Sequence, residues 1–469
     1  MTSDRSSAGG DVDAGSFRDP SGFVYRRDGR VLRQVNRSFG ARWDELAASG
    51  LLSDLQDRGI LVRHETRAVD DAFSRSEAHA VIEPEQIPLI SYPYEWSFSQ
   101  LKDAALLTLE AQSVAATAGF TMRDASAFNV QFLNGAPILV DTLSFERTVP
   151  GRPWIAYRQF CEHFVGPLAL MAYRDVRCGL LLRELIEGVP VDLAATLLPG
   201  RTKLNVGLAS HLHAHASAQR RETRRGGSAP AAPAPRMGDL QQRALLDSLR
   251  RTLARLNWDP SKTAWASYAD NTSYDPTAEA SKDGLVRRYL ESAGGRTVWD
   301  LGANTGRFSA IAASLGRQVI ALDTDAGATE LHYRNIRRAG ERSILPLLID
   351  LANPSPGLGW ANAERRSLLE RANADTVLAL ALVHHLTIGR NVPMPMIADA
   401  LGDLGAQLIV EFIPESDPMV STLLTTRTDI RPYPSIESFR EVFGGRFEIL
   451  DDEPIAMSGR RLLRMLRVS

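Results

Sequence analysis

Short apolar runs alternate with longer amphipathic stretches in the second half of the chain. The apolar runs predict strands at residues 297–301, 318–322, 342–349, 375–383 and 408–412. The stretches between these runs predict helices, and two alternating runs at 446–450 and 461–466 predict a closing antiparallel pair. Strands that alternate with helices indicate an open α/β sheet whose strands are mostly parallel.

The first half of the chain has a less regular pattern. It predicts a long helix over 101–118, a buried helix over 154–173, and two short strands around the Asn134-Gly135 turn. Residues 217–238 are rich in arginine, glycine, alanine and proline, which is typical of a linker. An amphipathic helix is predicted over 239–256. The expected organisation is an α+β accessory domain at 1–216, a linker at 217–238 and an α/β domain at 239–469.

Composition limits the classes of protein that fit. The 469 residues are 44% hydrophobic and 23% charged, which is typical of a folded protein of two or three domains. The net charge of −2 disfavours a dedicated nucleic-acid binder. Cys161 and Cys178 do not have the spacing of a metal site, so no metal is expected there. We expect a cytoplasmic bacterial protein without a membrane partner, because no signal peptide or membrane-length apolar run is evident and arginine greatly exceeds lysine.

The turn after residue 301 carries the most specific signal. It reads Asp300-x-Gly302-x-x-x-Gly306, and Asp323 follows the next predicted strand about twenty residues later. Glycines let a backbone approach a ligand closely, and a carboxylate can accept hydrogen bonds from ribose hydroxyls. A pyrophosphate would be repelled by Asp300, whereas an ammonium group would be attracted. The spacing therefore disfavours a nicotinamide-dependent oxidoreductase.

This segment resembles motif I of class I S-adenosylmethionine-dependent methyltransferases. The resemblance implies a Rossmann-like seven-stranded sheet and S-adenosylmethionine as the cofactor. It also implies that Asp323 binds the ribose and that the side chain at the end of the third strand lies near the adenine amino group. The implied cofactor-binding residues are Asp300, Gly302, Ala303, Asn304, Gly306, Asp323, Asp350 and Leu351.

Candidate catalytic residues follow the fourth and fifth predicted strands. His384 and His385 end the fourth, and Glu411 lies in the fifth. An acceptor hydroxyl or carbon acid needs a base, and a histidine that titrates near neutral pH suits that role. The Asn/Asp-Pro-Pro-Tyr signature of amino-methyltransferases is absent after the fourth strand, which disfavours a DNA-adenine or glutamine acceptor. The acceptor is expected to be a small molecule. Tyr268 and Tyr274 are candidates for a lid over the cofactor, with core packing as the alternative.

A second signal lies in the first half. Arg123-Asp124 is followed by Asn129, and a hairpin then leads to Asp141. This segment resembles the catalytic segment of protein kinases and aminoglycoside phosphotransferases. The resemblance implies that Asp124 accepts the substrate hydroxyl proton and that Asn129 and Asp141 hold Mg²⁺ beside ATP.

The same segment departs from the kinase pattern in one important respect. No lysine precedes Lys102, so Arg33 is the only substitute for the phosphate-binding lysine. A degenerate kinase-like domain that binds a substrate or partner is therefore favoured. The alternatives are a bifunctional kinase–methyltransferase and a non-catalytic protein that senses S-adenosylmethionine. The two-part organisation also resembles bacterial two-part methyltransferases, some of them nodulation-type proteins.

Overall fold

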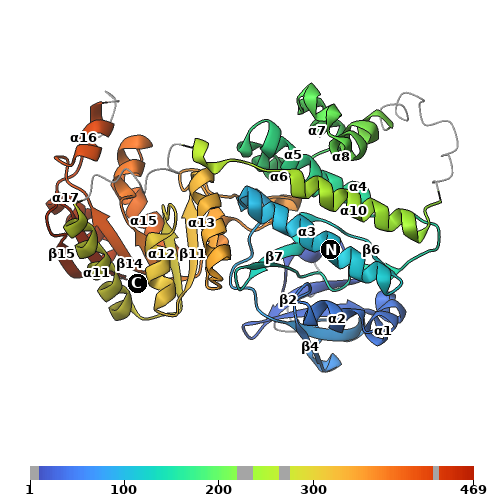
Figure 1. Cartoon of the computed structure of the whole chain (residues 1–469). Helices are drawn as coiled ribbons and strands as arrows, with labels where there is room; N and C mark the ends of the chain where they lie inside the picture. Colours follow the sequence, from blue (N-terminus) through green and yellow to red (C-terminus); the bar gives the residue numbers. More distant parts are fainter. Residues whose placement is uncertain (1–9, 219–235, 264–274, 426–431, 469) are drawn as a thin grey trace. The chain divides into compact units, whose positions relative to one another are not determined.

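The computed structural model describes residues 10–218, 236–263, 275–425 and 432–468 (Figure 1). The chain divides into two compact units. Unit 1 comprises Met1–Trp258 and Gly357–Arg366, and unit 2 comprises Asp259–Pro356 and Ser367–Ser469. Most of the predicted linker, and both lid candidates Tyr268 and Tyr274, lie outside the described residues.

Unit 2 is built around a seven-stranded sheet in the order β12-β11-β10-β13-β14-β16-β15. Strands β12 to β14 are parallel, whereas β16 runs antiparallel to both β14 and β15. The predicted α/β sheet and its closing antiparallel pair are therefore confirmed. The strands are β10 (Thr297–Leu301), β11 (Gln318–Asp323), β12 (Ile344–Leu348), β13 (Ala374–Ala379), β14 (Gly405–Phe412), β15 (Phe447–Pro454) and β16 (Arg461–Arg467).

Helices cover both faces of this sheet. The order of the strands in the sheet reverses between β10 and β13. Because crossovers between parallel strands are right-handed, the helices that follow β10 and β11 lie on one face of the sheet, and the helix that follows β13 lies on the other. The helices are α11 (Pro276–Ala293), α12 (Arg307–Ser314), α13 (Ala326–Ala339), α14 (Leu368–Arg371), α15 (Met394–Leu404), α16 (Pro418–Thr425) and α17 (Ile436–Gly444). The point of reversal is where open α/β sheets bind ligands.

The fourth strand is shorter than predicted. The apolar run continues to Val383, but β13 ends at Ala379 because Ala381 adopts a positive φ of 50°. A π-helical turn then begins at His385. The two histidines therefore lie in the turn after the strand.

Unit 1 has the expected α+β character. Its main sheet is antiparallel, in the order β1-β2-β3-β5-β4, and smaller two-stranded sheets and helices follow. The strands are β1 (Asp11–Val12), β2 (Gly22–Arg27), β3 (Arg30–Asn36), β4 (His64–Arg67), β5 (Ala78–Pro84), β6 (Phe120–Met122), β7 (Val130–Leu133), β8 (Ala136–Leu139) and β9 (Phe145–Arg147). The helices are α1 (Gly40–Ala48), α2 (Leu51–Asp57), α3 (Phe98–Thr117), α4 (Tyr157–Phe160), α5 (Gly166–Tyr173), α6 (Leu181–Glu184), α7 (Val191–Leu197), α8 (Val206–Leu208) and α10 (Asp239–Arg255).

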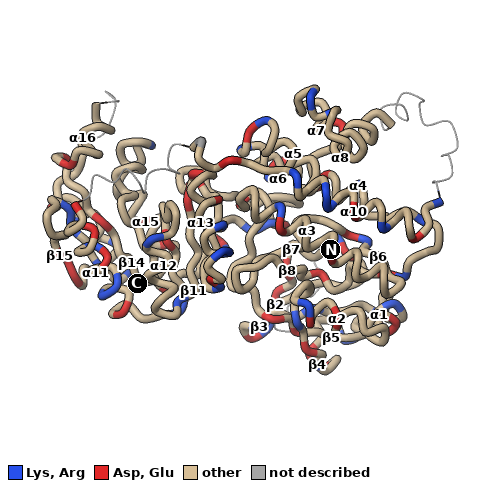
Figure 2. The backbone as a smooth tube through the Cα atoms, in the orientation of Figure 1, with Lys and Arg blue, Asp and Glu red and all other residues tan. Residues whose placement is uncertain are grey.

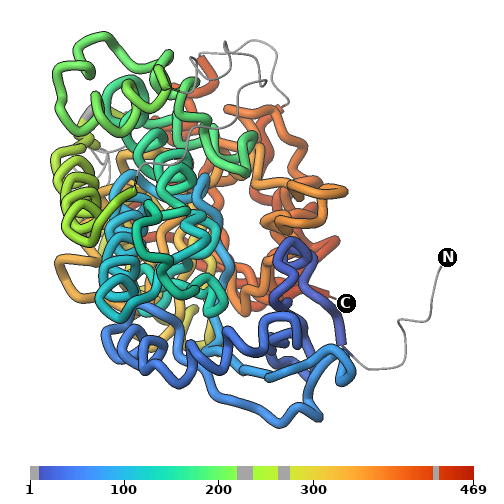
Figure 3. The backbone as a smooth tube through the Cα atoms, turned by 90° about the vertical axis from the view of Figure 1, so that its right-hand side faces the viewer, coloured from blue at the N-terminus to red at the C-terminus, as the bar shows by residue number. Residues whose placement is uncertain are grey.

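Helix α10 belongs to unit 1, although the sequence places it at the start of the second domain. It packs against α3 (Figure 3). Lys102 on α3 donates hydrogen bonds to the carbonyls of Ala254 and Leu256. The division between the units therefore follows Trp258 rather than residue 238. An amphipathic pattern predicted the helix but not the surface on which it packs.

Acidic and basic residues are interspersed along both units (Figure 2). Within the described part of the chain, no helix combines the length and apolarity that crossing a membrane requires.

Candidate functional site

The glycine turn after β10 is held against the end of β11. The backbone N–H groups of Gly302 and Ala303 both donate to the Leu322 carbonyl, at 2.8 and 3.0 Å. Gly302, Asn304 and Gly306 have positive φ values of 73°, 49° and 92°. A Cβ atom at Gly306 would lie 2.0 Å from Nε2 of the buried His332, so only glycine fits there. Helix α12 begins immediately after Gly306.

Asp323 connects the two strands at this point. Its Oδ2 accepts a hydrogen bond from the Asn304 backbone N–H at 2.8 Å, and its Oδ1 accepts one from the Asp325 N–H at 2.8 Å. Burial raises the pKa of Asp323, although these N–H donors oppose that effect. A carboxylate has about four acceptor positions, so lone pairs remain for ligand hydroxyls.

Asp300 is buried at the end of β10. Its Oδ2 accepts a hydrogen bond from Ser309 Oγ on α12 at 2.6 Å. Burial raises the pKa of Asp300 to about 6, against the opposing effect of the Ser309 hydrogen bond. A cationic ligand group nearby would lower this pKa and favour the ionised form.

Asp350 follows β12 and is half-buried. Its Oδ1 accepts the N–H of Ala352 at 2.9 Å, and its Oδ2 pairs with the Arg390 guanidinium at 2.9 Å. Leu351 is also half-buried. Asp350, Asp300 and Asp323 follow or end the neighbouring parallel strands β12, β10 and β11, and the carboxyl ends of these strands lie at one edge of the sheet.

His384 and His385 lie side by side, with ring centroids 4.1 Å apart. Burial lowers the pKa of His384 to about 3, and it also lowers the pKa of His385. The expectation that these rings titrate near neutral pH is therefore wrong for His384. Both imidazoles are neutral at pH 7, and a neutral imidazole can accept or donate a hydrogen bond.

Glu411 lies in a buried network of charges. Its Oε2 is 2.6 Å from Lys282 Nζ on α11, and its Oε1 is 3.3 Å from Arg460 Nη1. Arg460 also pairs with Asp417 at 2.7 Å. Because two cations hold this carboxylate, its charge is compensated within the protein, and it is a weaker candidate for a base than the sequence alone indicates.

Lys282, Arg460 and Ser309 were not predicted as site residues. A signal for Lys282 does exist, because it lies at helical spacing among apolar positions that α11 buries, Ala278, Leu285, Val286 and Tyr289. A lysine on the apolar face of a helix indicates a buried partner. No comparable local signal marks Arg460 or Ser309.

The residues of the kinase-like segment line one cavity of about 360 Å³ in unit 1. Asp124, Asn129 and Asp141 all contribute to its wall. Arg33 also lines it, and its Nη2 lies 2.6 Å from Asp141 Oδ1. Burial favours the neutral acid, but Arg33, Ser144 and the Leu143 N–H outweigh it and hold the pKa of Asp141 below its usual range. No group of three or more His, Cys, Asp or Glu side chains suited to a metal occurs among the described residues.

Comparisons with known proteins place these observations in context. The nodulation protein NoeA of Rhizobium meliloti (strain 1021) is 34% identical over 462 residues, which are 96% of this chain and 94% of NoeA. No family model matches the chain.

Several solved structures resemble part of the chain weakly. Magnesium protoporphyrin IX methyltransferase ChlM from Synechocystis PCC 6803, with bound SAH, is 18% identical over 42% of this chain and 89% of its own, with a TM-score of 0.32. The N-methyltransferase NodS from Bradyrhizobium japonicum WM9 is 12% identical over 42% of this chain and 99% of its own, with a TM-score of 0.31. The bifunctional kinase-methyltransferase WbdD is 14% identical over 44% of each chain, with a TM-score of 0.31.

Proposed function

The chain belongs to the family of the nodulation protein NoeA, and we propose that it is an S-adenosylmethionine-dependent methyltransferase that acts on a small molecule. The hydrogen bond between Asp323 and the Asn304 N–H carries this proposal. It joins the acid at the end of the second strand to the glycine turn after the first, at the reversal of strand order. A nucleoside ligand needs both features within its own length.

The residues present fit the cofactor chemically. Gly302 and Gly306 adopt the positive φ values that the turn requires, and Asp323 offers carboxylate oxygens to ribose hydroxyls. Asp300 has the charge that an amino-acid ammonium group requires, and Ser309 fixes its orientation. The cofactor supplies an electrophilic methyl group, so the protein's main task is to align an acceptor lone pair with the S–CH₃ bond.

The acceptor side is proposed to lie at the turn after β13. His384 and His385 are neutral there and can orient an acceptor hydroxyl or amine through hydrogen bonds. We assign the role of proton acceptor to His385 rather than His384, because a group with a pKa of about 3 is a weak base. The Glu411 carboxylate is assigned to holding Lys282 and Arg460 in place.

Unit 1 is proposed to be a kinase-like domain that binds rather than phosphorylates. The pairing of Arg33 with Asp141 supports this assignment, because it occupies the carboxylate that the kinase pattern reserves for Mg²⁺. A bifunctional kinase–methyltransferase would instead hydrolyse ATP and lose that activity on Asp141→Ala. A cofactor-sensing protein would bind S-adenosylmethionine tightly without turnover on any acceptor.

The test is calorimetric titration of the full chain with S-adenosylmethionine, followed by screening of small-molecule acceptors with a labelled methyl group. We expect micromolar binding that Asp323→Ala weakens about 10- to 100-fold, because charge-assisted hydrogen bonds to the ribose are lost. Asp399→Asn is the matched control, because this exposed acid on α15 pairs with Arg446 away from the turn. Unchanged affinity in folded Asp323→Ala, or no binding to the wild type, would overturn the assignment.

A further inference from the structure

We propose that the cavity of unit 1 binds an uncharged, polyhydroxylated small molecule about the size of a hexose. This proposal goes beyond methyl transfer and does not depend on it, because its residues all belong to unit 1. The cavity of about 360 Å³ lies in the size range of small-molecule sites.

The walls of this cavity come from several parts of the sequence, including three that bear charged side chains. Arg33 is contributed by β3, and the segment from Asp124 to Thr142 contributes the kinase-like residues. The third part is Glu364 and Arg365, which follow β12 in sequence but are part of unit 1. Arg18 holds this third part in place, because its Nε and Nη2 donate to the Glu364 carboxylate at 2.6 and 2.9 Å.

Several buried polar atoms of the wall lack a partner. Among the described residues, no hydrogen-bond partner is found for Arg33 Nε, Asn129 Nδ2, Thr142 Oγ1, His163 Nδ1 or Arg365 Nε. The side chains of Arg33, Thr142 and His163 belong to residues that are 9%, 1% and 2% exposed. A buried polar atom without a partner is unfavourable, so five such atoms on residues that line one cavity indicate a ligand that pairs with them.

The unpaired atoms are mostly donors, but an acceptor faces the same space. Asp124 lines the cavity, and its Oδ1 accepts from the Ser126 N–H and the Gln159 amide at 2.9 and 2.8 Å. Its Oδ2 has no partner among the described residues. A hydroxyl group can accept from Asn129 and donate to Asp124, whereas a phosphate or carboxylate can only accept.

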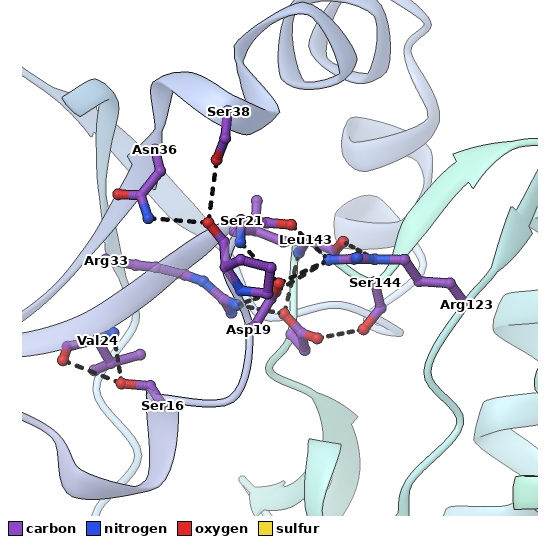
Figure 4. Close-up of polar contacts among 12 residues, drawn as sticks. Ser16, Asp19, Ser21, Val24, Arg33, Asn36, Ser38, Arg123, Leu143 and Ser144 are labelled. Carbon is purple, nitrogen blue, oxygen red and sulfur yellow. Dashed lines mark hydrogen bonds and ion pairs between the residues drawn. The ribbon is translucent and has the colours of Figure 1, made fainter. Parts of the chain in front are cut away.

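Seven acids and four arginines line the cavity, so the charges of the wall disfavour an anionic ligand. Arg33 is shared between Asp141 at 2.6 Å and Asp19 at 3.9 Å. Arg123 also pairs with Asp19 at 3.0 Å (Figure 4). An anion would meet the unpaired oxygen of Asp124, and a metal ion would meet the guanidinium groups of Arg33 and Arg365. Burial lowers the pKa of His163 to about 4, so its ring adds no charge at pH 7.

The experiment is calorimetric titration of the full chain with glucose, galactose, mannose and myo-inositol as neutral probes. Glucose 6-phosphate, glucosamine and Mg²⁺–ATP serve as charged comparisons. We expect saturable binding of at least one neutral probe with a Kd below about 1 mM. Binding of charged probes only, or of none of these probes, would overturn the proposal.

Two variants separate this site from a general effect on folding. Asn129→Leu removes a donor at similar volume, and Asp124→Asn removes the acceptor charge, so each should weaken binding of the neutral probe at least tenfold. Arg177→Gln is the matched control, because this exposed arginine of unit 1 pairs only locally with Asp175. Unchanged binding in both folded cavity variants would also overturn the proposal.

Discussion

Asp323 accepts a hydrogen bond from the backbone N–H of Asn304 at 2.8 Å, which fixes the end of β11 to the glycine turn after β10. The same carboxylate accepts the Asp325 N–H, just before α13 begins. One side chain therefore organises three segments around the proposed ribose site. Loss of this carboxylate should therefore affect both stability and ligand affinity.

Asp323→Asn should lower both cofactor affinity and the stability of the free protein. Burial raises the pKa of Asp323 and makes its ionised form costly at pH 7, but the amide replaces one of the two oxygens that accept backbone N–H groups with an NH2 donor that faces an N–H. The amide also loses charge-assisted bonds to the ribose, so the Kd should rise about tenfold or more. Thermal unfolding without ligand and calorimetric titration measure the two effects. A lowered melting temperature with unchanged affinity would contradict the assignment.

Gly306→Ala should destabilise the chain by about 2–4 kcal/mol, because it combines a clash with a positive φ. The new Cβ would meet the His332 ring at 2.0 Å, and φ at this position is 92°. Denaturant unfolding of the full chain measures the loss. Gly340→Ala is a suitable control, because its φ is also positive but nothing lies within 4 Å of a Cβ there.

A second substitution isolates the clash at Gly306. His332→Ala in the Gly306→Ala background should recover at least about 1 kcal/mol relative to the sum of the single effects. The strain of the positive φ would remain. Strictly additive effects would show that the His332 ring does not clash with the methyl group added at position 306.

The position of the candidate site could be predicted from the sequence, because each acid or histidine follows an apolar strand. The carboxyl ends of parallel strands meet at one edge of a sheet, so Asp300, Asp323 and Asp350 are brought to one edge by the strand pattern alone. The strand bounds were also close for β10 and β11. The predicted end of β13 lay too far along the chain, because the residue types of the apolar run do not reveal the positive φ of Ala381.

The partners of the site residues could not be predicted. Lys282 and Glu411 are far apart in sequence, and their pairing arises only when α11 packs against β14. The pairing of Arg33 with Asp141 is of the same kind, and it changes the interpretation of the kinase-like segment. Local patterns predict where a charge lies along an element, but long-range packing determines what neutralises it.

Lys282→Met should destabilise unit 2 by about 3 kcal/mol or more. The Lys282–Glu411 pair is almost fully buried, so the substitution leaves a buried carboxylate with less compensation. Glu411→Gln in the Lys282→Met background should recover part of the loss, because it removes the uncompensated charge. Denaturant unfolding measures these values.

The same helix offers a matched control for that experiment. Arg288 on α11 pairs with Glu453 at the same distance of 2.6 Å, but both side chains are exposed. Arg288→Met should therefore have a much smaller effect than Lys282→Met. Equal effects of the two substitutions would show that burial does not govern the Lys282 pair.

The buried Asp300 should make both stability and cofactor binding depend on pH near 6. Burial raises its pKa in the folded state from about 3.8 to about 6, so the folded protein holds this proton more tightly than the unfolded chain. The associated stability is fully present below pH 3.8 and is lost as the pH rises through 6. Asp300→Asn, which cannot ionise, should therefore be more stable than the wild type at pH 7.5, by on the order of 2–3 kcal/mol. This advantage should shrink as the pH approaches 4.

Cofactor affinity should show the opposite trend with pH. An ammonium group pairs with the ionised carboxylate, so wild-type affinity for S-adenosylmethionine should rise between pH 5 and pH 7, whereas the affinity of Asp300→Asn should be low and flat. Thermal unfolding and calorimetry across this range measure both trends on the same samples. A stability advantage for Asp300→Asn that does not vary with pH would show that Asp300 is ionised throughout. A flat wild-type affinity would show that the ammonium group does not pair with it.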